Sequence, residues 1–191
     1  MEITAEKIMQ QLSAGTQVAG VIAVFGEEGY YKDKIAAALP RAVFGDAAPE
    51  DREITVFERD TDIKEISAAV NTYPFFSGRS LVIIKDEKLW GGKDGGEKRK
   101  QQQEELAELL SDVPEHCQVL LLGEKIDKRG KLYKSLLKTA AMVECKSLKS
   151  YQLKPWLDEQ AALRGCRFDY EASQTIMEYL SVTCLLYTSD A

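Results

Sequence analysis

Apolar and polar positions follow two alternating patterns along most of the chain. Short apolar runs bounded by polar turns predict strands, and apolar residues recurring every three or four positions predict helices. Strands are predicted at residues 18–25, 53–58, 81–84, 118–122 and 142–145. Helices are predicted at about residues 4–12, 30–39, 63–71, 101–110 and 132–137. Strands that alternate with helices predict an α/β fold, with a mostly parallel sheet between layers of helices.

Proline predicts the end of two of these helices. Pro40 follows the helical pattern that begins at Tyr30, and Pro74 follows the pattern of residues 63–71. Proline lacks the N–H donor of a helix and disfavours helical geometry in the residue before it. We therefore expect both helices to end before their proline. The strand at residues 53–58 alternates between apolar and polar residues, which is typical of an edge strand.

The pattern changes near residue 148, where strands give way to helices alone. This change predicts a domain boundary, with an α/β domain at residues 1–148 and a partial helical domain at residues 149–183. Residues 184–191 depart from the pattern before them, and we expect them to be a translated, non-native tail.

Composition and charge narrow the functional classes. The chain has 191 residues, and its hydrophobic share of 45% is enough to build a core. Its formal net charge of -6 opposes broad attraction to nucleic-acid phosphates. No apolar run approaches the length of a membrane span, and acidic residues stand where a signal peptide carries basic ones. We therefore expect a cytoplasmic protein that does not contact membranes.

The four cysteines lie far apart in the sequence, and His116 is the single histidine. The cysteines are Cys117, Cys145, Cys166 and Cys184. A zinc site needs several such ligands at close spacing, so we expect no metal site and predict buried, reduced thiols. His116 and Cys117 are neighbours on a predicted strand and point apart, so nucleophilic catalysis is not expected there.

The turn after the first strand is where a nucleotide-binding protein would carry its phosphate loop. This chain has Gly26-Glu27-Glu28-Gly29 there and lacks the GxxxxGK[ST] pattern. Two carboxylates oppose phosphate binding, so we expect no nucleotide cofactor. Asp86 and Glu87 follow a strand in the manner of the metal and water ligands of an ATPase. A nucleotide hydrolase that uses one of them is the alternative function, although a solvated strand end is the simpler interpretation.

Aromatic residues flank a proline in the connection between a helix and a strand, at Tyr73, Pro74, Phe75 and Phe76. Exposed aromatics in a connection indicate a partner-binding anchor. One of the two phenylalanines could equally pack under its own helix as part of the core. The residues by themselves leave both interpretations open.

A glycine-rich stretch, residues 91–100, predicts a flexible loop with a short basic cluster. The cluster comprises Lys93, Lys98, Arg99 and Lys100. These cations are candidate contacts to DNA phosphate, but charge runs are more often simply solvated. A stand-alone DNA-binding module is therefore the third functional class.

The order and spacing of four segments resemble the delta subunits of bacterial DNA polymerase III. The segments are residues 24–28, 73–82, 128–132 and 154–168. The resemblance implies a P-loop NTPase-like fold of the AAA+ clamp-loader type, followed by a partial, all-helical lid domain. Members of this family also have a third, helical collar domain. Its absence here implies a truncated gene product.

The resemblance also implies a function and a site. It implies a non-catalytic subunit of a DNA-directed DNA polymerase, a nucleotidyltransferase, that does not hydrolyse ATP itself. The subunit would bind the beta sliding clamp and open the ring for loading onto primed DNA during chromosomal replication. Its partners would be the clamp, other loader subunits through the collar, and DNA within the assembly. Carried over to this chain, the clamp-binding residues are Tyr73, Phe75 and Phe76, and Pro74 would hold their loop extended.

Overall fold

The structure, a computed structural model, describes residues 1–15, 18–59, 61–85, 89, 96–147 and 149–187. Its internal contacts divide the chain into two units, Met1–Lys146 and Ser147–Ala191. The first unit holds the sheet and the helices that cover it, and the second holds two helices. The division falls close to the boundary predicted after residue 148.

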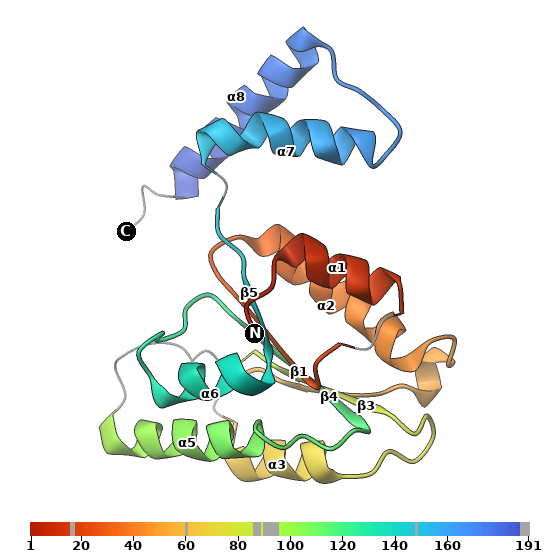
Figure 1. Cartoon of the computed structure of the whole chain (residues 1–191), viewed down its shortest axis with the longest axis vertical. Coiled ribbons are helices and arrows are strands. Elements are labelled where there is room, and N and C mark those ends of the chain that lie inside the picture. The colour runs from red at the N-terminus through yellow and green to blue at the C-terminus, as the bar shows by residue number, and fades with distance from the viewer. Residues whose placement is uncertain (16–17, 60, 86–88, 90–95, 148, 188–191) are drawn as a thin grey trace. The chain divides into compact units, whose positions relative to one another are not determined.

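Five parallel strands form one sheet in the order β2-β3-β4-β1-β5 (Figure 1). The strands are β1 (Val21–Phe25), β2 (Glu53–Phe57), β3 (Ser80–Ile84), β4 (Cys117–Gly123) and β5 (Ala141–Glu144). Every residue of β1 and β3 is buried, as expected for parallel strands covered on both faces. At the edge of the sheet, Ile54 and Val56 of β2 are 39% and 45% exposed. The predicted parallel α/β fold and the predicted edge strand are both confirmed.

Helices cover both faces of the sheet (Figure 1). One layer consists of α1 (Ala5–Ser13) and α2 (Gly29–Phe44), and the other of α3 (Ile63–Asn71), α5 (Gly96–Leu109) and α6 (Lys131–Thr139). A short 3-10 helix, Pro49–Asp51, precedes β2. Alternate residues of β1 point into two separate cores. Ile22 and Val24 pack with α1 and α2, whereas Val21, Ala23 and Phe25 pack with the other three helices.

The first residues of the chain lie beside β5 and cover its outer edge. The backbone N–H of Ile3 donates to the carbonyl of Met142, and that of Met142 donates to the carbonyl of Met1, both at 2.9 Å. Tyr133 of α6 donates its hydroxyl to Oε1 of Glu2 at 2.9 Å. Burial, with this carboxylate next in effect, raises the pKa of Tyr133 to about 12. These contacts leave less of the strand edge open to pairing with another chain.

The prediction that Pro40 ends its helix is wrong, because α2 continues to Phe44. Proline inside a helix removes one hydrogen bond and crowds the carbonyl four residues earlier, at a cost of about 3 kcal/mol. The turn beyond Pro40 places Val43 and Phe44 in the core, where both are buried. Burying two such side chains stabilises the fold by about 1.5 to 3 kcal/mol each, which offsets the cost of the proline.

The second unit consists of α7 (Ser150–Ala162) and α8 (Tyr170–Tyr187). Leu153, Leu157 and Ala161 are buried and recur every four residues along one face of α7. Residues 184–187 continue α8, and the suggested non-native origin of the tail stays a prediction. Within the described part of the chain, no helix combines the length and the apolar character that a bilayer span requires.

The cysteines follow the prediction only in part. Cys117 and Cys145 are buried in the sheet domain, but Cys166 is exposed, so the prediction of a buried thiol is wrong for that residue. The side chain of Cys184 lies outside the described part of the structure. Cys166 follows α7 in a surface turn, where little covers it. Burial raises the pKa of Cys145 to about 11 despite the opposing charge of Lys32, and burial likewise raises the pKa of Cys117.

The turn after β1 packs tightly against the end of β5. Gly26 has a φ of 130°, and a Cβ built on it would lie 2.0 Å from the carbonyl oxygen of Cys145. The backbone N–H of Glu28 donates to that same oxygen at 3.2 Å. Only glycine allows this approach without moving the backbone.

We expect Gly26→Ala to destabilise the fold by about 2 to 4 kcal/mol, because the new methyl group meets a fixed carbonyl and the backbone is strained at this φ. Gly29→Ala is the matched control, since a Cβ there meets nothing within 4 Å. Urea unfolding followed by circular dichroism measures both variants. Equal midpoints for the two would contradict this account of the turn.

The burial of the thiols predicts a difference in their reactivity at pH 8. Iodoacetamide should label the exposed Cys166 in the native protein well before Cys117 and Cys145, because a buried thiol with a raised pKa supplies little thiolate. Peptide mass mapping after timed labelling measures the order, and labelling in urea is the control. Early labelling of Cys145 in the native protein would show that its strand opens.

Candidate functional site

The connection between α3 and β3 presents aromatic side chains on the surface. α3 ends at Asn71, where Thr72 caps it by donating its backbone N–H and its hydroxyl to the carbonyl of Ala68, at 2.9 and 2.7 Å. The prediction that this helix ends before Pro74 is therefore confirmed. Pro74 is buried, and the chain then turns back toward the sheet.

Tyr73, Phe75 and Phe76 are 71%, 88% and 68% exposed. The rings of Phe75 and Phe76 meet edge to face, with centroids 5.1 Å apart. Neither ring lies under a helix, so the alternative of a core phenylalanine in this connection is wrong. We call Tyr73, Pro74, Phe75 and Phe76 the aromatic loop.

Glu53, the first residue of β2, holds the aromatic loop in place. Its Oε1 accepts hydrogen bonds from the backbone N–H groups of Phe75 and Phe76, the second at 3.0 Å. The end of the loop has its own turn, in which Ser77 donates its hydroxyl to the carbonyl of Arg79 at 2.7 Å. Sequence reasoning missed Glu53, because nothing in a local pattern relates it to residues 22 and 23 positions away.

Tyr73 packs against the loop that precedes β4. Its ring centroid lies 5.1 Å from that of His116, whose backbone carbonyl accepts from the N–H of Ser80 at 2.8 Å. Among the described residues, Nε2 of His116 has no hydrogen-bond partner although it is buried. Cys117 is part of the core on the side of the sheet that α3, α5 and α6 cover. His116 and Cys117 therefore do not form a nucleophilic pair.

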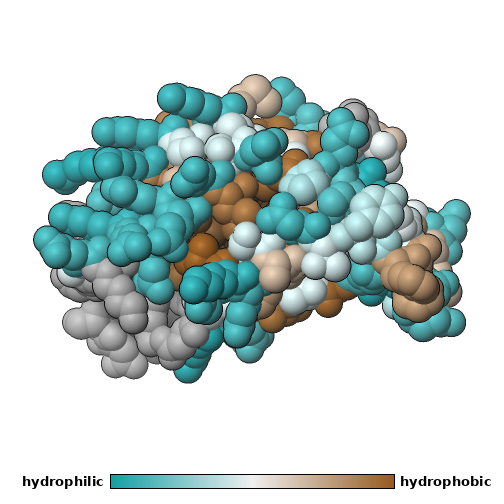
Figure 2. Space-filling model, turned by 90° about the horizontal axis from the view of Figure 1, so that it is seen from below, coloured by the Kyte–Doolittle hydropathy of each residue, from teal (hydrophilic) through white to brown (hydrophobic). Residues whose placement is uncertain are grey.

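The aromatic loop lies at the amino edge of the parallel sheet, because it enters β3, whereas the Gly26 turn leaves β1 at the carboxyl edge. The loop is at the right-hand end of the sheet domain in Figure 1. Figure 2 shows a group of hydrophobic atoms that projects at the same end of the molecule. The two candidate sites therefore lie at opposite edges of the sheet.

At the carboxyl edge, two charged side chains are hydrogen-bonded to the backbone of the Gly26 turn and of α2. A carboxylate oxygen of Glu28 accepts from the N–H of Tyr30 at 2.7 Å and caps the amino terminus of α2. Nζ of Lys32 donates to the carbonyl of Gly26 at 2.7 Å. A helix amino terminus binds anions through such free N–H groups, and here an internal anion already uses one. Asp86 and Glu87 lie outside the described residues.

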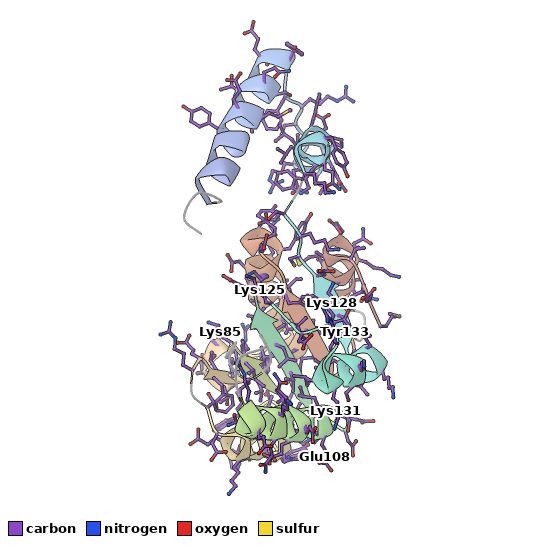
Figure 3. The ribbon with its side chains drawn as sticks, turned by 90° about the vertical axis from the view of Figure 1, so that its left-hand side faces the viewer. Lys85, Glu108, Lys125, Lys128, Lys131 and Tyr133 are labelled. Atoms are coloured by element: carbon purple, nitrogen blue, oxygen red, sulfur yellow. The ribbon has the colours of Figure 1, made fainter. Side chains whose placement is uncertain are left out.

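Lysines surround this carboxyl edge, and carboxylates pair with most of them. Lys85, Lys125, Lys128 and Lys131 lie on the side of the sheet domain that faces the viewer in Figure 3. Lys85 pairs with Glu58 at 3.4 Å, Lys128 with Glu144 at 2.8 Å and Lys131 with Glu104 at 2.6 Å. Burial alone would raise the pKa of Glu144, but hydrogen bonds from Lys128 and Lys146 leave it lowered. Carboxylates thus pair with three of these four lysines.

The basic cluster is only partly a loop. Lys93 lies outside the described residues, whereas Lys98, Arg99 and Lys100 belong to the first turns of α5, which begins at Gly96. The loop prediction is therefore wrong for residues 96–100, where good helix formers follow the last glycine. Among the residues that the structure describes, no three metal-ligating side chains gather, and sequence reasoning proposed no metal ligand.

Comparisons with known proteins relate the chain to one family. Residues 25–146, more than half of the chain, match the model of the family described as DNA polymerase III, delta subunit. DNA polymerase III subunit delta of Bacillus subtilis is 30% identical over 135 residues, which are 69% of this chain and 39% of that protein. The chain thus spans well under half of that relative.

A solved structure supports the fold. The DNA clamp loader delta protein of Bacillus subtilis superposes with a TM-score of 0.72 at 22% identity. The superposition covers 97% of this chain and 58% of that one. This likeness shows that the chain shares its overall fold with that protein. With the family match over residues 25–146, these findings show that the chain belongs to the DNA polymerase III delta subunit family.

Proposed function

We propose that this protein binds the beta sliding clamp through its aromatic loop and favours the open ring. The observation that carries the proposal is the exposure of Phe75 and Phe76, 88% and 68%, on a loop whose backbone N–H groups donate hydrogen bonds to Glu53. Exposed, ordered aromatics are the usual anchors of protein interfaces, because they bury a large area and freeze few rotors. Membership of the delta subunit family supports the choice of partner.

In the proposed loading step, binding of this subunit shifts the population of clamp rings from closed to open. A subunit that binds an open ring more tightly than a closed one raises the open fraction by the difference in binding free energy. The aromatic loop would supply affinity, and Pro74 would reduce the entropy lost on binding because its φ is already restricted. In this proposal the sheet domain, residues 1–148, is the clamp-binding part, and residues 149–183 are part of the lid.

We further propose that the protein is non-catalytic and leaves ATP hydrolysis to other loader subunits. The proposal rests on the carboxyl edge, where Glu28 caps α2 and Lys32 is bound to the carbonyl of Gly26. A bound triphosphate would have to displace both contacts and approach two carboxylates. The competing function of nucleotide hydrolase lacks a phosphate site among the described residues.

Other partners belong to the assembled loader in this proposal. Sister subunits would join through a collar domain, and the complex would act on DNA in the cytoplasm. The basic cluster would add phosphate contacts there, from Lys93, Lys98, Arg99 and Lys100. A net charge of -6 makes the isolated chain a poor DNA binder, which disfavours a stand-alone DNA-binding module.

Replacing both Phe75 and Phe76 with alanine should remove most of the affinity for the clamp. For Phe75→Ala with Phe76→Ala we expect a loss of about 2 to 4 kcal/mol, or roughly 30- to 1000-fold in Kd, because two exposed rings lose their contacts with the clamp. Surface plasmon resonance against a purified bacterial sliding clamp measures the change. Circular dichroism checks that the fold survives.

A second double variant controls for general loss of aromatic surface. Tyr170→Ala with Tyr179→Ala removes two rings that are as exposed as the anchors but lie in the second unit. We expect its affinity for the clamp to stay within about 3-fold of the parent chain. Equal losses in the two double variants would place the binding site outside the aromatic loop.

The non-catalytic proposal predicts that Mg-ATP does not bind at the Gly26 turn. Titration with a fluorescent ATP analogue should give no saturable signal up to about 1 mM, a Kd equivalent to about -4 kcal/mol. Saturable binding that Lys32→Ala removes would identify a nucleotide site and favour the hydrolase. Lys34→Ala is the control, since Lys34 points to Tyr30 of the same helix.

A further inference from the structure

The aromatic loop depends on one carboxylate that lies far from it in the sequence. Glu53 offers a single oxygen, Oε1, to the N–H groups of both Phe75 and Phe76. Hydrogen bonds to an ionised acceptor are stronger than those between neutral groups. Two consecutive N–H groups that point at one oxygen fix the path of the backbone between them. A fixed backbone in turn sets the directions in which the side chains of Phe75 and Phe76 project.

Glu53 is itself rigidly placed. It begins β2, and it lies opposite Ser80, the first residue of β3, in the parallel ladder. The aromatic loop leads into β3, which pairs with β2. The strand pairing therefore brings the carboxylate of Glu53 close to this loop. A group carried on a strand is positioned more accurately than one carried on a loop.

The carboxylate of Glu53 has no competing ion pair among the described residues. Its recorded side-chain contacts are the two loop amides. The other carboxylate at this strand, Glu58, lies beyond its opposite end and pairs with Lys85. Glu58 thus pairs with a lysine, whereas Glu53 binds the backbone N–H groups of the two exposed phenylalanines.

We propose that Glu53 is a positioning residue that holds the aromatic loop in its clamp-binding conformation before the clamp arrives. This inference rests on the proposed function, and it adds a residue that makes no direct contact with the partner. If the loop is ordered beforehand, less entropy is lost on binding. Without Glu53, only a fraction of the molecules present both rings correctly, and the apparent affinity falls by that fraction.

The test compares Glu53→Ala, Glu53→Gln and the matched control Glu58→Ala in the 191-residue chain, against a purified bacterial sliding clamp. For Glu53→Ala we expect the association rate to fall about 10-fold with little change in the dissociation rate, because fewer molecules are competent to bind. Glu53→Gln keeps an acceptor oxygen and should recover most of the rate. Glu58→Ala removes the same charge from the other end of β2 and should behave like the parent chain.

Hydrogen exchange at the amides of Phe75 and Phe76, followed by NMR in the free protein, gives a readout that does not depend on the clamp. Glu53→Ala should exchange these amides at least about 10-fold faster, while amides of β3 keep their protection. Unchanged exchange together with an unchanged association rate would overturn the proposal. A raised dissociation rate alone would overturn it too, since it would mean that Glu53 contacts the clamp directly.

The outcomes separate this inference from the proposed function. If the parent chain does not bind the clamp, the proposed function fails, and the exchange data still decide whether Glu53 orders the loop. If the parent chain binds and Glu53→Ala binds equally fast, the function stands and the positioning role is wrong. Circular dichroism of each variant excludes a general loss of folding.

Discussion

The parallel pairing of five strands in one sheet is the constraint on which the rest of the structure depends. Parallel neighbours need crossovers, and the crossovers here contain α2, α3, α5 and α6. Because all strands run in the same direction, every loop that enters a strand lies at one edge and every loop that leaves one lies at the other. The aromatic loop and the Gly26 turn are thereby separated, before any side chain is considered.

The two edges have opposite chemistry. At the carboxyl edge, Glu28 accepts from an N–H at the start of α2, and Lys32 donates to the carbonyl of Gly26. At the amino edge, Phe75 and Phe76 remain exposed although burying them would stabilise a monomer. In the proposed function, this exposed apolar loop serves to bind another protein.

The stability of the fold and the availability of the loop come from different contacts. The tight turn at Gly26 and the two cores hold the sheet together, and neither core includes Tyr73, Phe75 or Phe76. The loop is held by the end of α3 and by Glu53. A change in the loop can therefore alter binding while it leaves the sheet domain folded, which makes the two properties separable in variants.

The sequence by itself determined the strands, the parallel α/β class and the location of the aromatic loop, because apolar runs of five residues and a proline after a helix are local signals. It also related the chain to its family through the order of short segments. It failed at Pro40, where tertiary burial of Val43 and Phe44 outweighed a local rule. Only the tertiary structure decided that the phenylalanines face outward and that Glu53 holds them. The strand register brings together residues more than twenty positions apart, and no local pattern encodes that contact.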